Sequence, residues 1–133
     1  MNLTQIRKTD VNFGLDGEKT ILNRLQNLFG DDLEKTTKKY ATFDFENNNT
    51  LVELKTRRCT SKSFNDTMIG YNKYEFAKKT EKDVYFCFNF TDGLYYHKFD
   101  TNHDYNIRNF ERYREGEFNK PHVFINNCDM IKA

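Results

Sequence analysis

The sequence predicts a single domain of the mixed α and β class (α/β, more specifically α+β), in which a mixed β-sheet is flanked by helices. Three observations predict this fold: a helical stripe of apolar residues over 16–29, segments with a period of two over 42–57 and 83–99, and a second helical pattern over 66–79. With 133 residues, 37% of them hydrophobic, the chain is long enough to bury one core. One domain is therefore the simplest interpretation of residues 1–133.

The first predicted helix runs from Asp16 to Phe29 and ends at Gly30. Its apolar residues recur at the spacing of one helical face, and Glu18 falls inside that stripe. Burying an unpaired charge is costly, so this carboxylate must be partnered, neutralised or placed at the edge of the stripe, where a site opens. The alternative is an ordinary acid of the first turn, which interacts well with the helix dipole and stays solvated.

The segment 42–57 is predicted to form a two-stranded hairpin. If Asn48 and Asn49 are the two central residues of its turn, Asp44 lies directly opposite Glu53. Opposed side chains have Cβ atoms roughly 4.5 to 5.5 Å apart, and like charges placed there repel each other. A folded chain needs a reason to tolerate such a pair.

Lys55 completes the polar face of this hairpin. It lies two residues beyond Glu53, on the same face, and about 7 to 8 Å from Asp44 along the diagonal. The opposite face is apolar and is expected to pack in the core: Phe43, Phe45, Val52 and Leu54. The alternative is an ordinary half-exposed sheet with its polar residues outward, in which the lysine only forms ion pairs with the acids.

A hard divalent cation would make the opposed carboxylates favourable. Mg²⁺ (or Mn²⁺) binds carboxylate oxygens, keeps several waters and removes the repulsion between Asp44 and Glu53. The three histidines lack the spacing of metal ligands, and the three cysteines show no paired spacing. The sequence therefore predicts a metal site made of oxygen ligands.

The rest of the chain is predicted to complete the sheet and its helical cover. The expected elements are a second helix over 66–79, a strand over 83–90, a tight turn at Asp92 and Gly93, a strand over 94–99, a short helix around 104–115 and a terminal strand after Pro121 with a turn at Asn126 and Asn127. In the strand over 83–90, every second residue from Val84 to Phe90 is apolar, and these residues are expected to share one buried face.

Positive charge gathers in the stretch that follows the hairpin. The totals are balanced, with 21 Lys and Arg against 20 Asp and Glu, which argues against a protein that coats polyanions through bulk charge. Each basic residue near the acids could simply be solvated surface, but as a cluster they favour a nucleic-acid ligand, because a polyanion must be drawn toward acids that repel it. The expected phosphate contacts are Arg57, Arg58, Lys62, Lys73 and Lys78.

Targeting signals and disulfides are not expected. No apolar run approaches the roughly 18 residues that a membrane helix needs, and the N-terminus lacks the apolar block of a signal peptide. The cysteines are odd in number and widely spaced, which is not the pattern of a disulfide framework. We therefore expect a soluble, intracellular protein of the cytoplasm or nucleus, with reduced thiols and no membrane partner.

The chain resembles the PD-(D/E)XK nuclease superfamily in a few residues: Glu18, Asp44 and the triplet ELK at Glu53 to Lys55. The last two have the spacing Asp-x8-Glu-x-Lys. The glutamate on the first helix is similar to that of the Holliday-junction resolvase-like branch. The resemblance implies a restriction-endonuclease-like fold, with a mixed β-sheet flanked by helices. Its motif core covers about 14–80, whereas 81–133 adds strands and a polar segment of arginines and aromatics that match no part of the family pattern.

The resemblance implies a Mg²⁺-dependent endonuclease that hydrolyses phosphodiester bonds in DNA. The metal ligands carry over to Asp44 and Glu53 with Glu18 in support, and the catalytic lysine carries over to Lys55, which would orient the attacking water. The same site would also serve an RNA-cleaving nuclease. An alternative of another class is a noncatalytic nucleic-acid- or protein-binding module on a nuclease-like scaffold. A domain this short offers little surface to grip a duplex, which leaves room for a homodimer or a larger partner.

Overall fold

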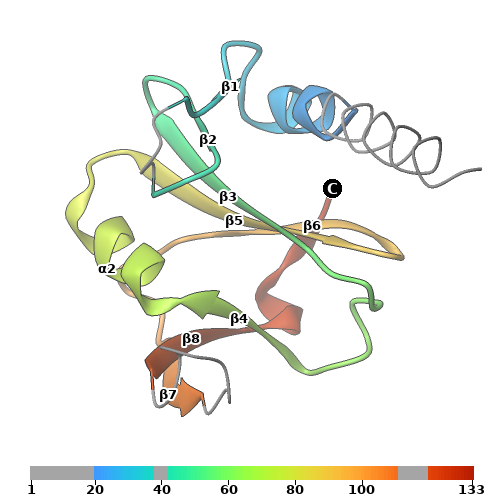
Figure 1. Ribbon diagram of the computed structural model, residues 1–133, viewed down its shortest axis with the longest axis vertical. Helices are drawn as coiled ribbons and strands as arrows, with labels where there is room; N and C mark the ends of the chain where they lie inside the picture. Colours follow the sequence, from blue (N-terminus) through green and yellow to red (C-terminus); the bar gives the residue numbers. More distant parts are fainter. Residues whose placement is uncertain (1–19, 38–41, 111–119) are drawn as a thin grey trace, which may run out of the picture.

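The computed structural model describes residues 20–37, 42–110 and 120–133. These residues form a mixed α and β fold, in which a mixed sheet is flanked by two helices (Figure 1). This agrees with the fold class predicted from the sequence. Within the described residues, no helix is both long and apolar enough to cross a bilayer.

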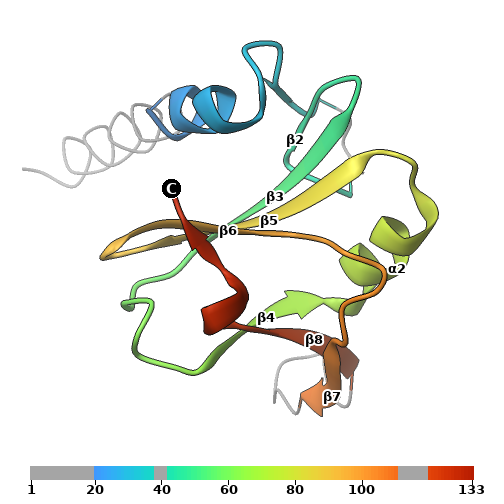
Figure 2. The same ribbon diagram turned by 180° about the vertical axis from the view of Figure 1, so that it is seen from behind.

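The larger sheet has six strands in the order β1-β2-β3-β5-β6-β9. Their bounds are β1 Glu34–Lys35, β2 Phe45–Glu46, β3 Thr50–Thr56, β5 Asp83–Phe90, β6 Gly93–Lys98 and β9 Ile131–Lys132. β3 and β5 are parallel, and the other neighbours in this sheet are antiparallel. Figure 2 shows β9 returning beside β6 at the edge of the sheet. Parallel neighbours need a crossover connection, which here contains one strand and one helix.

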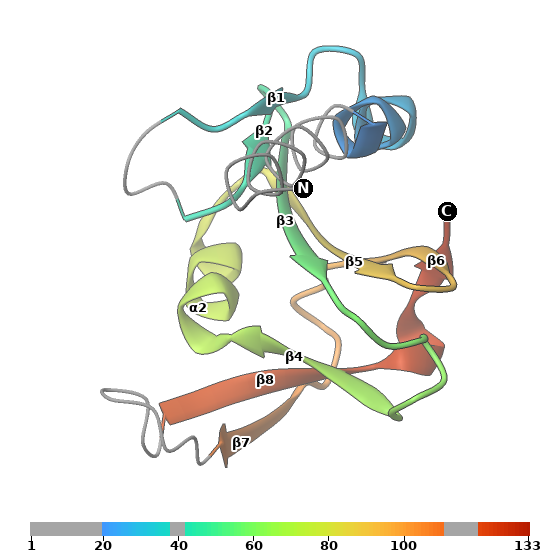
Figure 3. The ribbon, with the colours of Figure 1, turned by 45° about the vertical axis from the view of Figure 1, so that its right-hand side comes forward.

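The smaller sheet is antiparallel and has the order β4-β8-β7. Its strands are β4 Asp66–Gly70, β8 Lys120–Asn126 and β7 Asn106–Phe110, and the helix that follows β4 is α2, Tyr71–Lys79. A short 3-10 helix, η1 Asn127–Asp129, links β8 to β9. Figure 3 shows α2 and the smaller sheet on one side of the larger sheet, and the N-terminal helix on the other.

Two hydrophobic clusters hold these layers together. The N-terminal helix, described over residues 20–29, packs on one face of the larger sheet. The buried side chains of that cluster are Ile21, Leu25, Leu33, Phe45, Val52, Cys87 and Leu94. The cluster on the other face joins the sheet to α2 and the smaller sheet, and its buried side chains are Phe43, Leu51, Ile69, Ala77, Val84, Phe86, Phe88, Phe90, Val123 and Ile125.

The first hairpin has the predicted register. Phe45 pairs with Val52 in the antiparallel ladder, and the backbone N–H of Asn47 donates to the carbonyl of Thr50 at 3.0 Å. The prediction that Phe43 shares a face with Phe45 is wrong, because the chain bends over residues 42–44 before β2 begins. Phe43 packs instead in the cluster on the α2 side of the sheet.

The second hairpin also forms, with its turn one residue earlier than predicted. Phe90 pairs with Gly93, so that Thr91 and Asp92 are the turn residues. Gly93 has a φ of 145°, a backbone conformation that side chains with a Cβ rarely adopt, which explains glycine at this position. The alternating apolar residues of β5 are all buried on one face, as predicted.

Two predicted helices are corrected by the structure. The helix expected over 66–79 begins only at Tyr71, and its first five residues form β4, where Thr67 and Ile69 are buried and pair with β8. Gly70 ends the strand in an extended conformation, and its weak helix propensity suits that boundary. The short helix expected around 104–115 is instead strand β7 over Asn106–Phe110, because pairing with β8 decides its conformation, while 111–115 lies outside the described residues.

Candidate functional site

The candidate site lies on the face of β3 that is covered by α2. Leu51, in the core cluster on this face, is followed two residues later by Glu53 and then by Lys55. In the parallel ladder Glu53 stands beside Phe86 of β5, whose side chain is fully buried. The carboxylate of Glu53 therefore lies in apolar surroundings, and the face predicted to point away from the core is covered.

The carboxylate of Glu53 is the most unusual group of the site. The residue is only 4% exposed, and its Oε2 has no hydrogen-bond partner in the part of the chain that the structure describes. Lys55 Nζ lies 3.4 Å from Oε1, and Lys73 Nζ lies 3.4 Å from Oε2. Both contacts are ion pairs, and the contact of Lys73 with Oε2 does not have the geometry of a hydrogen bond. A buried polar atom without a hydrogen bond is costly and needs a physical explanation.

Asp44 is held by the backbone of the neighbouring strand. Its backbone N–H donates to the carbonyl of Val52 at 3.0 Å, and its Oδ2 accepts a hydrogen bond of 2.9 Å from the backbone N–H of Leu54. The charge of Asp44 raises the pKa of Glu53, so the two carboxylates interact. The hairpin thus brings the opposed acids together, with Asp44 in the bend that leads into β2.

Lys73 belongs to this site although the sequence suggested only a phosphate contact. Its side chain is 19% exposed, and in addition to the ion pair with Glu53 its Nζ donates a hydrogen bond to the carbonyl of Thr42. The ammonium also lies 5.6 Å from the ring centroid of Phe43. Placing the helix start at residue 66 hid this role, because the true start at Tyr71 puts Lys73 in the first turn of α2, facing the hairpin.

The remaining predicted basic residues are spread over two regions. Arg57 follows β3 and is partly buried, whereas Arg58 and Lys62 are exposed in the loop that leads toward β4. Lys78 lies near the end of α2, where its Nζ is 3.3 Å from Glu75 Oε1. The phosphate contacts predicted from the sequence stay predictions, and Arg57, Arg58 and Lys62 are the members that share one loop.

Glu18, the predicted supporting acid of the first helix, lies outside the described residues. Among the residues that are described, no group of three or more His, Cys, Asp or Glu side chains is placed to hold a metal ion. Asp44 and Glu53 remain as a pair of carboxylates. Mg²⁺ is typically bound through one or two carboxylates together with waters and substrate phosphates, so this donor set suits it. Oε2 of Glu53, which accepts no hydrogen bond from the described residues and is only ion-paired with Lys73, would supply an oxygen for it.

Burial and, secondarily, the charge of Asp44 raise the pKa of Glu53 above its ordinary value, while Lys73 and Lys55 act in the opposite direction. The metal-free folded protein therefore keeps the Glu53 proton in a pH range where the unfolded chain has released it. It follows that this residue contributes stability below the ordinary glutamate pKa, and that this contribution is lost as the pH rises through the raised pKa.

This linkage gives a first prediction. In the presence of a chelator, the free energy of unfolding of wild type falls with rising pH through this range, and Glu53→Gln reduces that fall. The measurement is urea unfolding at a series of pH values above 4. The matched control is Glu46→Gln on the neighbouring strand, at an exposed residue, which keeps the wild-type slope. A Glu53→Gln variant with the same pH slope as wild type would contradict the assignment.

The structure thus places the ammonium groups of Lys55 and Lys73 beside the buried carboxylate of Glu53, whose pKa is also raised by the charge of Asp44; these four residues make up the site. Three of these residues belong to the site predicted from the sequence, and Lys73 was expected to contact phosphate nearby. Comparisons of the chain with protein-family models, with curated proteins and with solved structures gave no match.

Proposed function

We propose that the protein is a metal-dependent nuclease that hydrolyses phosphodiester bonds in DNA, with Asp44 and Glu53 as ligands of Mg²⁺ or Mn²⁺. The observation that carries the proposal is the buried carboxylate of Glu53. Its Oε2 has no hydrogen-bond partner in the described part of the chain, and its pKa is raised by burial and by the charge of Asp44. A divalent cation would remove the repulsion between Asp44 and Glu53, and it would give Oε2 of Glu53 the partner that no hydrogen bond supplies.

Asp44 and Lys55 would have different roles in the reaction. A cation at the two carboxylates would supply the charge that polarises the scissile phosphate and lowers the pKa of a water. Asp44 is fixed by its hydrogen bond from Leu54 N–H, so its carboxylate is oriented before any ligand arrives. Lys55, with a side chain 36% exposed, lies between Glu53 and solvent, where its ammonium would orient the attacking water and offset charge on the phosphorane.

Lys73 would hold the other side of Glu53. Its ammonium neutralises part of the acid charge in the metal-free protein, and its bond to the carbonyl of Thr42 ties α2 to the chain that leads into Asp44. When a cation binds the carboxylates, this ammonium remains anchored by the carbonyl. Lys73 is therefore a positioning residue in the proposal, and Lys55 is the catalytic lysine.

The resemblance to the PD-(D/E)XK superfamily supports the same function. Of the residues that carry it, Glu53 and Lys55 lie on β3 of a mixed sheet flanked by helices, and Asp44 lies in the bend that leads into β2. A restriction-endonuclease-like fold is part of the proposal. Glu18 would support the metal from the first helix. The cytoplasm or nucleus, expected from the sequence, stays the proposed location, and a second copy of the chain would enlarge the surface that grips the substrate.

A second candidate is a noncatalytic binding module on the same scaffold. The observation that favours it is the pair of lysines, since Lys55 and Lys73 already place positive charge beside both oxygens of Glu53. In that case the carboxylate is a structural ion-pair centre and needs no cation. The two candidates make different predictions: a nuclease cuts DNA and loses this activity when one site residue is replaced, whereas a binding module does not cut DNA.

The test is a cleavage assay with plasmid, single-stranded DNA, branched DNA and RNA, in Mg²⁺ or Mn²⁺. We expect wild type to cut DNA, and Asp44→Asn and Lys55→Ala to cut at least about 100-fold more slowly, because removing one group that stabilises charge in the transition state typically costs about 10²- to 10³-fold. Matched controls are Asp83→Asn and Lys98→Ala, which alter an exposed ion pair of 3.9 Å and should cut as wild type does.

The outcomes separate the candidates. If wild type cuts no more than Asp44→Asn, the nuclease proposal is wrong and the binding module remains. If only RNA is cut, and the same substitutions stop the reaction, the site is a nuclease site with a different substrate.

A further inference from the structure

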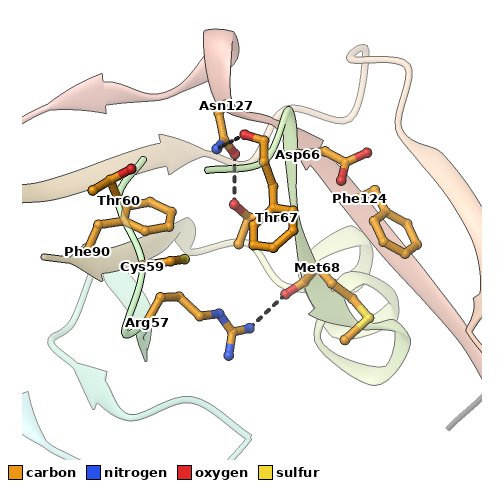
Figure 4. A pocket seen from close by; sticks show the side chains of 10 residues that line it. Arg57, Cys59, Thr60, Asp66, Thr67, Met68, Phe90, Phe124 and Asn127 are labelled. Atoms are coloured by element: carbon orange, nitrogen blue, oxygen red, sulfur yellow. Dashed lines mark hydrogen bonds between the residues drawn. The ribbon is translucent and has the colours of Figure 1, made fainter. Parts of the chain in front are cut away.

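A second site lies beyond the carboxylates, where β3 ends. A pocket of about 330 Å³ opens between the chain that follows β3, the end of β5 and the smaller sheet (Figure 4). Its walls are largely apolar, and the residues that matter here are Arg57, Cys59, Phe64, Met68, Phe90 and Phe124. This volume is at the lower end of the range for small-molecule sites in proteins.

The most exposed wall of this pocket is an aromatic ring. Phe64 is 68% exposed, the largest exposed fraction among the large hydrophobic residues that the structure describes. Phe90 is buried at the back of the pocket, and Phe124 lies on the side of the smaller sheet. An exposed ring at the mouth of an apolar pocket is suited to stack on a flat partner, and stacking on aromatic side chains is how single-stranded nucleic acids are bound without regard to sequence.

The loop that carries this ring is basic. Residues 57–65 include Arg57, Arg58 and Lys62 and contain no acid. The guanidinium of Arg57 donates one hydrogen bond, of 3.4 Å, to the carbonyl of Met68, and the described residues give it no acidic partner. This partly buried arginine keeps further N–H donors that could bind a phosphate, and the exposed ring that lines the same pocket could stack on a base.

Asn127 holds this loop in place. Its Nδ2 donates to the carbonyls of Ser61 at 2.8 Å and Phe64 at 2.9 Å, and its Oδ1 accepts a hydrogen bond of 2.7 Å from the hydroxyl of Thr67. Ser61 is also bound through its hydroxyl to Asp92 at 2.6 Å. The loop is therefore tied to both sheets, and the pocket is formed before a ligand arrives, which lowers the entropic cost of binding.

The pocket and the carboxylate site lie along one line. One face of β3 and its continuation carries, at every second residue, Glu53, Lys55 and Arg57. The backbone N–H of Arg57 still donates to the carbonyl of Asn89 at 2.9 Å, so the chain remains paired with β5 up to this residue. Four residues of extended chain span about 13 Å. A nucleic-acid strand with one phosphate at Glu53 could therefore run along β3 to Arg57, which lines the pocket together with Phe64.

We propose that this pocket binds an unpaired nucleobase of a single-stranded segment, with Phe64 stacked on the base and Arg57 on the adjacent phosphate. The proposal deepens the proposed nuclease function, on which it rests for the position of the cut, by naming the substrate class. DNA with a single-stranded segment is preferred over continuous duplex, in which every base is paired and cannot enter the pocket.

The experiment measures binding and not cleavage. Fluorescence anisotropy follows a labelled single-stranded oligonucleotide and the corresponding duplex in the presence of a chelator. Wild type is expected to bind the single strand more tightly than the duplex, and Phe64→Ala to weaken single-strand binding about 5- to 150-fold, which is the fold-change of ~1–3 kcal/mol of stacking. Duplex binding should change less than twofold.

Three further variants complete the experiment: two are controls, and one tests the phosphate contact. Phe64→Tyr keeps the ring and should bind the single strand as wild type does. Arg57→Gln should weaken binding and reduce its dependence on salt concentration. Ile131→Ala removes an exposed apolar side chain from β9, outside the pocket lining, and should have no effect. Melting curves verify that each variant folds.

The outcomes keep this proposal separate from the nuclease proposal. Equal binding of the single strand by wild type and a folded Phe64→Ala variant would overturn the pocket assignment, even if wild type cuts DNA. Single-strand binding that depends on Phe64 would support it, even if wild type cuts nothing in Mg²⁺ and the nuclease proposal fails. Equal affinity of wild type for single strand and duplex would show phosphate contacts alone and would also overturn it.

Discussion

Replacing Glu53 with glutamine is expected to abolish DNA cleavage and cation binding while leaving the metal-free protein at least as stable as wild type. The amide keeps the shape of the carboxyl group and removes a charge that is buried and repelled by Asp44. Lys73 retains its hydrogen bond to the carbonyl of Thr42, so its ammonium is not left without a partner. The substitution therefore removes a proposed cation ligand with little loss of folding stability.

The expected loss of metal affinity in Glu53→Gln is at least about 100-fold, because replacing even an outer-sphere partner of a metal site typically costs 10- to 100-fold. Calorimetric titration of Mn²⁺ measures the loss of affinity, cleavage rates in Mg²⁺ measure the loss of activity, and melting curves in chelator measure the stability of the metal-free protein. Glu46→Gln, the same change at an exposed position, is the control for both. A large drop in the melting temperature of metal-free Glu53→Gln would show that Glu53 serves the fold through its lysines.

The largest effect on stability is expected from Phe86→Ala. Phe86 is 0% exposed, stands beside Glu53 in the parallel ladder, and packs against the rings of Phe43 and Phe99 at centroid distances of 6.4 and 6.5 Å. Truncating a buried phenylalanine to alanine removes its transfer free energy and leaves a cavity. We expect the free energy of unfolding to fall by about 3 to 5 kcal/mol.

Urea unfolding in chelator measures this loss, and Phe64→Ala is the matched control. That substitution removes the same atoms from a ring that is 68% exposed, so the unfolding free energy should change by less than about 0.5 kcal/mol. A loss below about 1 kcal/mol for Phe86→Ala would contradict the packing described between β5 and α2.

The sequence predicted those parts of the fold that depend on local periodicity. The register of the first hairpin follows from the positions of Asn48 and Asn49 between two alternating segments, and the structure confirms it at Phe45 and Val52. The buried face of β5 could be predicted equally well, because side chains in a strand alternate strictly between its two faces. In both cases, neighbours in the sequence decide which side chains share a face.

Features that depend on distant partners were missed. Residues 66–70 and 106–110 are strands because each pairs with β8, and neither segment carries an alternation strong enough to reveal that pairing. The later start of α2 follows from the strand that precedes it, and it brings Lys73 onto Glu53. The acids themselves were predicted from the hairpin register, whereas the burial of Glu53 required the position of the covering helix.

The pocket at the end of β3 also could not be predicted from local sequence patterns. The sequence pointed to Arg57 and Lys62 as basic residues that follow the hairpin, but nothing local predicts that Phe64 stays exposed above them. Asn127, more than 60 residues later, binds the loop that carries this ring. Such a long-range anchor leaves no periodic signal in the sequence.

The most direct test of the proposed metal site is calorimetric titration of Mn²⁺ into the metal-free protein at neutral pH, comparing wild type with Asp44→Asn and Glu53→Gln. We predict binding to wild type that is lost in both variants and kept in Glu46→Gln. No binding heat for wild type at saturating Mn²⁺, or equal binding by all four proteins, would contradict the assignment of Asp44 and Glu53 as cation ligands.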